Sequence, residues 1–400
     1  MFVKHLISSK FRRAITFLRY QSTAYLSENK EDLIIKIKDR NEHFPLVWLR
    51  DNCRCESCFH HNSNSRIIDW STFDTSPTVK NIEVVANDVI VKWQDNHTST
   101  FDAKWLGKRS FLKESQNNYL ENKYRVKKIL WYKNGITSLT NEFDYHDVMN
   151  NKSTLYKWLI DLARYGVSFV QNVPNDKTAC RKVANRIAFI RKTHYEDEFD
   201  IISKPTTSNV AYLNGNLQLH TDLPYYEYTP GVTLLHCLVQ TEATGGESLL
   251  TDGFHVVEKL RKENKETFDI LSSVNVNWVD VGAEHGDKYH TIYRSPVIKL
   301  DSEGKVEKVL HSVPQRDSHF TVDKDLVIKW YKAMKIFVDQ INLNAFKFKL
   351  TSGTLMAFDN TRLLHGRVGY QDLGNNQRHL IGCYLDWDEI FSRIRVLSEE

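Results

Sequence analysis

Short runs that alternate apolar and polar residues dominate the chain between about residues 31 and 105. The stretches DLIIKIKD (32–39), FPLVWLRD (44–51) and NDVIVKWQD (87–95) are rich in β-branched and aromatic residues and are bounded by Asn, Asp or Pro, which predicts strands. Polar residues predominate after them, and we expect a linker at 111–130. The pattern thus predicts a small β domain at 28–110 and a larger domain at 131–400.

The larger domain mixes helical and strand periodicities. Apolar residues recur at helical spacing near its start, at Tyr156, Leu159 and Leu162 and again at Val183, Ile187 and Ile190. Helical insertions are expected at about 254–272 and 323–342. Strands are predicted at VSFVQNV (167–173), VTLLHCLV (232–239), ESLLTD (247–252), GTLMAFDN (353–360) and RHLIGCYLDW (378–387). Many strands with long, irregular insertions favour a mainly β fold with flanking helices, a double-stranded β-helix (jelly roll), over a doubly wound sheet.

The net charge of +4 is concentrated at the N-terminus. Residues 1–27 hold five of the 54 basic side chains and no acidic one, which leaves 49 basic against 50 acidic residues elsewhere. A neutral body does not favour nucleic-acid binding, and without a run of eighteen apolar residues we expect no membrane span. The basic, hydroxyl-rich, acid-free segment 1–27 predicts a mitochondrial transit peptide. The alternative is a disordered tail of a cytoplasmic protein.

An imidazole and a carboxylate stand two residues apart in LQLHTDLPYY, at His220 and Asp222. Positions i and i+2 of a strand face the same side, so both groups can reach one ion. His365 follows the predicted strand GTLMAFDN. Two His and one carboxylate form the facial triad of non-haem iron(II) oxygenases, with positions open for 2-oxoglutarate and dioxygen. An isolated H-x-D is usually a surface coincidence, but the strand-end position and the second histidine favour an iron site.

Arg378 begins a predicted strand thirteen residues after His365. A guanidinium there can hold the distal carboxylate of 2-oxoglutarate with two parallel hydrogen bonds, whereas the alternative is a structural salt bridge. His236 lies in an apolar strand without a spaced partner, and we expect a hydrogen-bonded core histidine.

Three cysteines form a C-x-C-x-x-C motif at Cys53, Cys55 and Cys58, which is too tight for disulfides. Three thiolates and one imidazole make a closed tetrahedral site for structural zinc. His97, on a predicted hairpin, is a better fourth ligand than His60 or His61, which are too near to close a useful loop. The alternative is three reduced cysteines without metal. The remaining cysteines are scattered and are expected to be small buried hydrophobes.

From about residue 31 to its end, the chain resembles the gamma-butyrobetaine and trimethyllysine dioxygenase family. The C-x-C-x-x-C, H-T-D-x-P and D-W-D motifs look more like the butyrobetaine branch, because the trimethyllysine enzymes have a non-Cys residue in the middle of the first motif. The stretches that carry the resemblance are WLRDNCRCESC, WQDNH, NVAYLNGNLQLHTDLP, GVTLLHCL, TGGESLLTDGF, FDNTRLLHGR and RHLIGCYLDWD.

The resemblance implies a zinc-binding N-terminal domain, a double-stranded β-helix catalytic domain and a homodimer. It implies hydroxylation of gamma-butyrobetaine to L-carnitine, in carnitine synthesis in the mitochondrial matrix, coupled to decarboxylation of 2-oxoglutarate to succinate, with ascorbate as a further cofactor. The site residues that it implies are His220, Asp222 and His365 for iron, Arg378 for 2-oxoglutarate, Cys53, Cys55, Cys58 and His97 for zinc, Tyr195, Phe199, Tyr212 and Tyr384 as an aromatic cage for a trimethylammonium group, and Asn209 near the substrate carboxylate.

Two positions depart from the family pattern. Residue 199 is Phe where the family has Trp, a weaker cation–π face. The segment HSVPQRD lacks the paired asparagines of the butyrobetaine enzymes, one of which touches the substrate carboxylate. Hydroxylation of trimethyllysine is therefore the alternative reaction. A rival of another class is a non-catalytic zinc-dependent interaction protein, against which an intact triad together with Arg378 argues.

Overall fold

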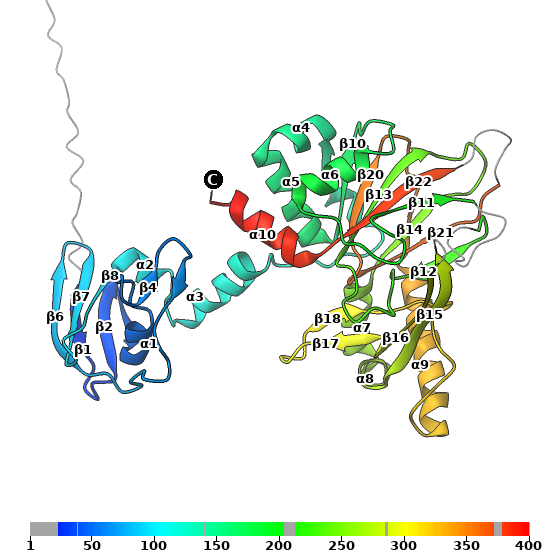
Figure 1. The fold of residues 1–400 in the computed structure, drawn as a ribbon. Helices are drawn as coiled ribbons and strands as arrows, with labels where there is room; N and C mark the ends of the chain where they lie inside the picture. Colours follow the sequence, from blue (N-terminus) through cyan, green and yellow to red (C-terminus); the bar gives the residue numbers. More distant parts are fainter. Residues whose placement is uncertain are drawn as a thin grey trace, which may run out of the picture. The chain divides into compact units, whose positions relative to one another are not determined.

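The chain forms two compact units, Met1–Tyr124 and Arg125–Glu400 (Figure 1). The computed structural model describes residues 23–37, 39–139, 141–203, 213–284, 287–371 and 378–399. The predicted transit peptide therefore lies almost entirely outside the described residues. Among the described residues, no helix is long and apolar enough to cross a lipid bilayer.

The first unit is built from two three-stranded antiparallel sheets. Buried residues alternate with exposed ones along the strands, so that Leu33 and Ile35 of one sheet and Val89 and Val91 of the other are fully buried in a shared core. One sheet holds β1 (Ala24–Leu26), β2 (Asp32–Ile37) and β3 (Arg40–Pro45), and the other holds β6 (Val79–Val85), β7 (Asp88–Trp93) and β8 (Thr98–Asp102).

The segment FPLVWLRD is only partly a strand, so that prediction was wrong for its last six residues. β3 ends at Pro45, and the helix α1 (Leu46–Asp51) begins at the next residue. Proline has no N–H to continue the ladder, but it is tolerated at a helix start. Leu46 and Leu49 then share one helical face and are both buried.

Short elements complete the first unit. A two-stranded hairpin follows the cysteine motif, and helical segments lie within the predicted linker. These elements are β4 (Phe59–His60), β5 (Ser65–Arg66), α2 (Ala103–Gly107), α3 (Lys113–Asn118) and the π-helical turn η1 (Tyr119–Tyr124).

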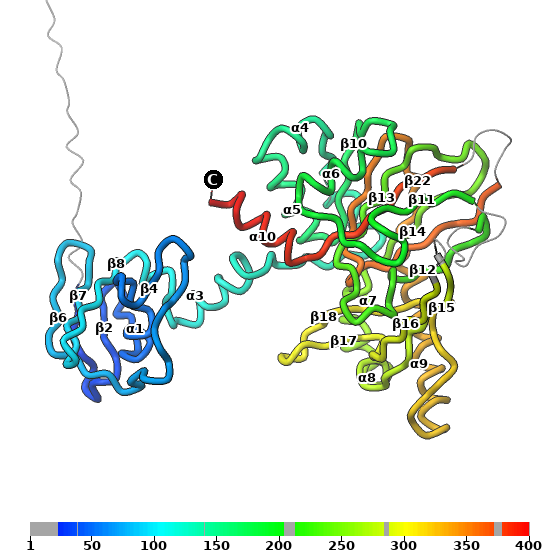
Figure 2. The backbone as a smooth tube through the Cα atoms, in the orientation of Figure 1, coloured from blue at the N-terminus to red at the C-terminus, as the bar shows by residue number. Residues whose placement is uncertain are grey.

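The second unit is a double-stranded β-helix, as predicted. Its larger sheet has the strand order β11-β22-β13-β20-β10-β9, and its smaller sheet has the order β12-β21-β14-β19. Strands distant in sequence are neighbours, as the adjacent traces of β12 and β21 show (Figure 2). The strands are β9 (Glu142–Asp144), β10 (Val167–Gln171), β11 (Glu198–Ile202), β12 (Leu217–His220), β13 (Val232–Val239), β14 (Ser248–Asp252), β19 (Phe346–Phe348), β20 (Leu355–Asp359), β21 (Leu363–Arg367) and β22 (His379–Leu385).

Helices cover the larger sheet on its outer face. Trp158 of α5 packs in one core with Leu234 of β13 and Cys383 of β22. Cys180, Cys237 and Cys383 are all buried, as predicted. The predicted helix around Val183 ends at Ile187 and does not reach Ile190. The covering helices are α4 (Tyr145–Asn150), α5 (Lys152–Tyr165), α6 (Ala179–Ile187) and α10 (Trp387–Leu397), and the 3-10 turn η2 (Ile136–Ser138) precedes them.

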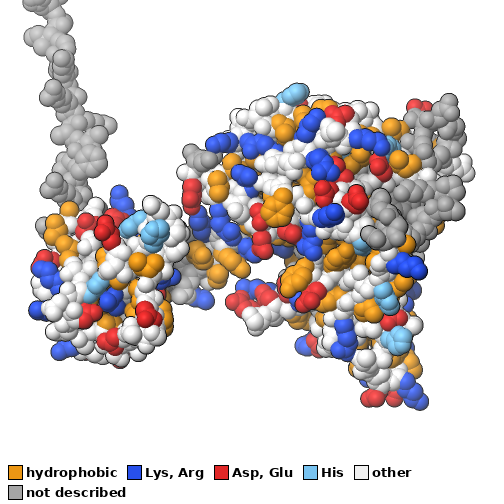
Figure 3. Space-filling model, in the orientation of Figure 1, with side chains coloured by type: hydrophobic (Ala, Val, Ile, Leu, Met, Phe, Trp, Pro, Cys, Tyr) orange, Lys and Arg blue, Asp and Glu red, His pale blue; other side chains and the backbone are white. Residues whose placement is uncertain are grey.

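A second group of helices and two hairpins lie beside the smaller sheet (Figure 1). They correspond to the two predicted helical insertions and the segment between them. These elements are α7 (Gly253–Glu263), α8 (Lys265–Ser273), β15 (Val276–Glu284), β16 (Asp287–Ser295), β17 (Ile298–Leu300), β18 (Val306–Val309) and α9 (Lys324–Leu343). On the face drawn in Figure 3, charged side chains of both signs are interspersed over each unit, in keeping with the neutral composition.

Candidate active site and zinc site

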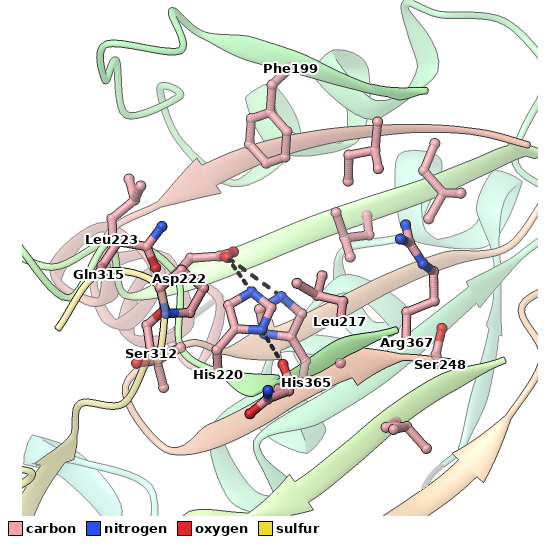
Figure 4. A pocket seen from close by; sticks show the side chains of 18 of the residues that line it. Phe199, Leu217, His220, Asp222, Leu223, Ser248, Ser312, Gln315, His365 and Arg367 are labelled. Atoms are coloured by element: carbon pink, nitrogen blue, oxygen red, sulfur yellow. Dashed lines mark hydrogen bonds and ion pairs between the residues drawn. The ribbon is translucent and has the colours of Figure 1, made fainter. Parts of the chain in front are cut away.

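The three predicted iron ligands meet at one point. His220 is the last residue of β12 and is the direct cross-strand partner of His365 in β21. Asp222 lies two residues beyond the end of β12, so the prediction that it shares a strand with His220 was wrong, although the two side chains do converge. The ligand atoms of all three residues lie within 4.8 Å of one another. Figure 4 shows the three side chains directed toward one another.

The spacing of the three side chains suits one divalent ion that they would bind from one side. An oxygen of Asp222 lies 3.5 Å from Nε2 of His220 and 3.5 Å from Nε2 of His365. Atoms this far apart can both lie about 2.1 Å from a shared ion. Nδ1 of His220 lies 2.8 Å from the carbonyl oxygen of Gln218. Donation of the Nδ1 proton to that oxygen leaves the Nε2 lone pair toward the shared point.

Electrostatics keeps these side chains in the forms that bind metals. Burial would raise the pKa of Asp222, but His365 and His220 beside it outweigh burial and lower that pKa to about 2. Burial lowers the pKa of His365 to about 4. At neutral pH the carboxylate is therefore anionic and the His365 imidazole neutral, which is what a metal ligand requires.

Asn360, which the sequence reasoning missed, fixes the backbone of Asp222. The Asp222 N–H donates to Asn360 Oδ1 over 2.7 Å, and Asn360 Nδ2 donates to the carbonyl oxygens of Asp222 (2.9 Å) and Pro230 (3.1 Å). Thr233 donates to the Asp222 carboxylate over 3.3 Å. Asn360 and Thr233 are fully buried, so these bonds are shielded from competing water.

The turn that follows β12 and carries Asp222 is also held by a neighbouring segment. The Thr221 N–H donates to the His311 carbonyl over 2.8 Å, and the His311 N–H donates back to the Thr221 hydroxyl over 3.0 Å. Leu223 follows in the left-handed region with φ 51°, which costs a branched apolar residue about 1 kcal/mol or more. The surrounding hydrogen bonds stabilise this left-handed conformation of Leu223 beside the candidate metal ligands. No short sequence pattern predicts it.

The three candidate iron ligands open onto a pocket of about 310 Å³. Arg378 lines this pocket, is 4% exposed and stands immediately before β22. Arg367 also lines the pocket, and its Nη2 donates to the carbonyl oxygens of Leu213 and Gly215. Figure 4 shows Arg367 to the right of the two imidazoles and Phe199 above them. The pocket therefore holds guanidinium groups within the same space as the carboxylate and imidazoles.

Aromatic rings form another wall of the pocket. Tyr195, Phe199 and Tyr384 all line it, with ring centroids 6.4 Å apart between Tyr195 and Phe199 and 5.0 Å apart between Phe199 and Tyr384. A Cβ at Gly382 would lie 2.3 Å from the Phe199 ring, so a glycine is required for that ring to lie against β22. The other predicted cage residue, Tyr212, and Asn209 lie outside the described residues.

The cysteine motif and His97 form a second cluster, in the first unit. Nε2 of His97 lies 3.3 Å from the sulfur of Cys53 and 3.6 Å from those of Cys55 and Cys58. A tetrahedral zinc ion, with Zn–S about 2.3 Å and Zn–N about 2.05 Å, would separate sulfur and nitrogen by about 3.6 Å. The donor set and its spacing therefore fit structural zinc, and His60 and His61 are not part of the cluster.

Charged neighbours tune this cluster. Arg50 Nη1 donates to the Cys58 sulfur over 3.5 Å, and its Nη2 lies 3.3 Å from Asp95, which accepts the His97 N–H. Burial and the charge of Arg50 lower the pKa of His97. Burial raises the pKa of Cys53 to about 11, whereas hydrogen bonds from Ser57 and the neighbouring thiols outweigh burial at Cys55 and lower its pKa to about 7. A bound cation would deprotonate all three thiols.

A jelly roll with two imidazoles and one carboxylate at an open pocket defines a class, the non-haem iron oxygenases. Residues 135–384 match the family described as taurine catabolism dioxygenase TauD, TfdA, and residues 25–107 match the N-terminal domain described as gamma-butyrobetaine hydroxylase-like. The chain belongs to the gamma-butyrobetaine and trimethyllysine dioxygenases of this TauD/TfdA family, which are iron- and 2-oxoglutarate-dependent.

The similarity to individual relatives extends over most of both chains. The gamma-butyrobetaine dioxygenase of Homo sapiens is 35% identical over 89% of this chain and 91% of its own length. That of Pseudomonas sp. (strain AK-1) is 34% identical over 89% and 90%. The mitochondrial trimethyllysine dioxygenase of Homo sapiens is 30% identical over 94% and 88%. Both units of the chain are thus represented in these relatives.

Proposed function

We propose that this protein hydroxylates gamma-butyrobetaine to L-carnitine, with decarboxylation of 2-oxoglutarate to succinate. The observation that carries this proposal is the aromatic wall of Tyr195, Phe199 and Tyr384, which faces the same pocket as the iron ligands. Ring faces attract a trimethylammonium group. The higher identity to gamma-butyrobetaine dioxygenases than to trimethyllysine dioxygenases supports the same substrate.

His220, Asp222 and His365 would hold the iron, and the chain's other residues position the reactants. Bound iron supplies the oxidation of a C–H bond by dioxygen, coupled to 2-oxoglutarate decarboxylation. Arg378 binds the distal carboxylate of 2-oxoglutarate as a bidentate partner. Apolar side chains that also line the pocket, including Leu217, Leu235 and Met356, exclude water around the reacting carbon.

A substrate comparison tests the proposed reaction. The purified protein is supplied with iron(II), 2-oxoglutarate and ascorbate, and then with gamma-butyrobetaine or trimethyllysine. We expect succinate and carnitine, with a kcat/KM at least ten times higher for gamma-butyrobetaine. A higher kcat/KM for trimethyllysine would show that trimethyllysine hydroxylation is the function. If no substrate gave succinate, the result would favour a non-catalytic zinc-dependent interaction protein.

Two substitutions test the assigned residues. His220→Ala should abolish turnover in a folded protein, whereas His290→Ala, an exposed histidine of β16, should retain it. Arg378→Lys keeps the charge but loses the guanidinium fork, so it should raise the KM for 2-oxoglutarate more than the KM for the substrate. An unchanged KM for 2-oxoglutarate would make Arg367 the anchor instead.

We further propose that the chain is a mitochondrial matrix protein and a homodimer, with domains at 28–110 and 131–400 joined by a linker at 111–130. The basic, acid-free segment 1–27 and a relative named as mitochondrial support the location. A fluorescent fusion with and without residues 1–27 tests it, and a cytoplasmic full-length fusion would refute it. Light scattering of the purified protein distinguishes a dimer from a monomer.

A further inference from the structure

A largely buried carboxylate lies close behind the aromatic wall of the pocket. Asp280, in β15, approaches His194 with 3.8 Å between Asp280 Oδ2 and His194 Nε2, and the two side chains are only 14% and 12% exposed. Asp280 and His194 do not line the pocket themselves. The pair is separate from the iron ligands and from the zinc cluster.

His194 connects this carboxylate to the wall. Its ring centroid lies 4.1 Å from that of Tyr195, and its Nε2 lies 3.5 Å from the hydroxyl of Tyr225. Tyr195 and Tyr225 line the pocket, and Nδ1 of His194 lies 2.9 Å from the hydroxyl of Tyr226. Asp280 is therefore one side-chain layer away from the space that a substrate would fill.

The net charge of the pocket suggests a role for the Asp280 carboxylate. The ionised groups among the described lining residues are Asp222, Arg367 and Arg378. With a divalent iron and a doubly charged 2-oxoglutarate in place, these groups leave one net positive charge. A quaternary ammonium group would meet this charge in a buried space, where Coulomb interactions are weakly screened. One more negative charge near the aromatic wall removes the imbalance.

Tyr225 can transmit part of the effect of the Asp280 charge to a cation in the pocket. It is 1% exposed, and its hydroxyl is directed toward His194 and Asp280 while the residue also borders the pocket. Burial, and then the neighbouring Tyr195 and Asp280, raise the pKa of Tyr225, so the phenol stays protonated. A phenol that faces an anion through its hydroxyl presents an electron-rich ring face, and such a face binds cations more strongly.

We propose that Asp280 is the residue that selects cationic substrates, as a negative countercharge behind the aromatic wall. This inference rests on the proposed function, because it concerns the same pocket and its trimethylammonium ligand. The occupant is an organic cation without N–H donors, since rings surround the site and a primary ammonium would lose its hydrogen bonds there.

The test compares gamma-butyrobetaine with its carbon isostere, in which carbon replaces the quaternary nitrogen, so that the positive charge is lost and the carboxylate is kept. The ratio of their kcat/KM values is measured at one fixed pH for the wild type and for Asp280→Asn, Asp280→Glu and Asp269→Asn. Asp269 is a half-exposed carboxylate of α8 that pairs with Lys265, so it serves as the matched control. Dissociation constants of both compounds are measured by anaerobic calorimetry as a second readout.

We expect Asp280→Asn to lower the ratio of kcat/KM for gamma-butyrobetaine to that for the isostere about ten-fold, mainly through the KM of gamma-butyrobetaine. Asp280→Glu should restore most of the ratio, and Asp269→Asn should leave it unchanged. An equal loss for both compounds in Asp280→Asn would assign Asp280 a structural role and overturn the inference. An unchanged ratio would overturn it too, while the proposed function stands.

The proposed function and the inference can fail separately. If the wild type hydroxylates neither compound, the proposed function fails. Calorimetry then still tests the role of Asp280. A pocket that binds gamma-butyrobetaine no better than the isostere has no effective countercharge. If the wild type prefers trimethyllysine, the function changes, but loss of affinity for both cationic substrates in Asp280→Asn would still support the inference.

Discussion

Replacing Asn360 tests whether the backbone of Asp222, a proposed iron ligand, must be held in place. The side chain makes three hydrogen bonds, two to the backbone of Asp222 and one to the carbonyl of Pro230, and it is fully buried. A hydrogen bond contributes about 1 kcal/mol net, and a buried group left unpaired costs more. Asn360→Ala should therefore lower the free energy of unfolding of the metal-free protein by about 3 kcal/mol or more.

The effect on metal binding should be separable from the effect on stability. Loss of a group that orients a metal ligand typically weakens the site about 10–100-fold, and we expect a loss of this size in iron affinity. Asn360→Asp keeps the shape and the acceptor for the Asp222 N–H, but it faces two carbonyl oxygens without a donor. It should weaken iron binding nearly as much as Asn360→Ala.

Urea unfolding gives the stability change, and iron titration of the folded variants gives the affinity. Asn342→Ala is the control, because Asn342 is an exposed asparagine of α9 whose amide donates to the Val338 carbonyl. That variant should change the free energy of unfolding by less than about 0.5 kcal/mol. If both Asn360 variants bound iron with the affinity of the wild type, the proposed role of Asn360 in holding Asp222 would be refuted, even if their stability were lower.

Three further predictions concern zinc, the aromatic wall and the core. Cys58→Ser should remove zinc from metal analysis and destabilise the first unit, because metal binding there is also folding energy; equal zinc content in the variant would exclude the site. Gly382→Ala should displace the Phe199 ring, since the new Cβ would lie 2.3 Å from it, and raise the substrate KM about three- to ten-fold; an unchanged KM would show that this ring does not bind substrate. Burial lowers the pKa of His236 to about 4, so the folded state binds fewer protons than the unfolded state, and stability should fall as the pH drops from about 6.5 to 4. His236→Leu should flatten that part of the urea-unfolding profile, and an identical pH dependence would contradict the assignment.

His236 also shows what periodicity can and cannot predict. Its place in an apolar strand correctly predicted a buried residue, and it is 0% exposed. The expected hydrogen bond was wrong, because neither ring nitrogen has a partner in the described part of the chain. Burial follows from the local pattern, whereas a hydrogen bond depends on which residues the neighbouring strands and helices bring near.

The same distinction separates the proposed iron ligands from the groups that hold them. The convergence of His220 and His365 was predictable, because each follows a recognisable strand and because their residue types suit a metal. Asn360 was not, although it lies only five residues before His365: its bonds reach Asp222, 138 positions away. That contact exists because the turn after β12 meets the end of β20, and a single sequence does not reveal this meeting.

The double-stranded β-helix also explains how one pocket can receive an anion and a cation. Arg378 stands just before β22, and Tyr384 is near the end of that strand. Six residues of extended chain separate them by about 20 Å, and both border the pocket. Tyr384 is the cross-strand partner of Thr233, which donates to the proposed iron ligand Asp222. The aromatic end of β22 is therefore the end near Asp222, and the guanidinium lies at the opposite end.

This polarity bears on how the two ligands would be oriented. A 2-oxoglutarate whose distal carboxylate pairs with Arg378 extends from that end of the pocket toward the iron ligands. A trimethylammonium group at Tyr384 approaches them from the other end, where Asp280 adds a negative charge behind the wall. Exchanging the two ligands would put the cation beside two arginines and the dianion beside a carboxylate. The charge distribution of the pocket therefore opposes the reversed arrangement before any contact with iron is made.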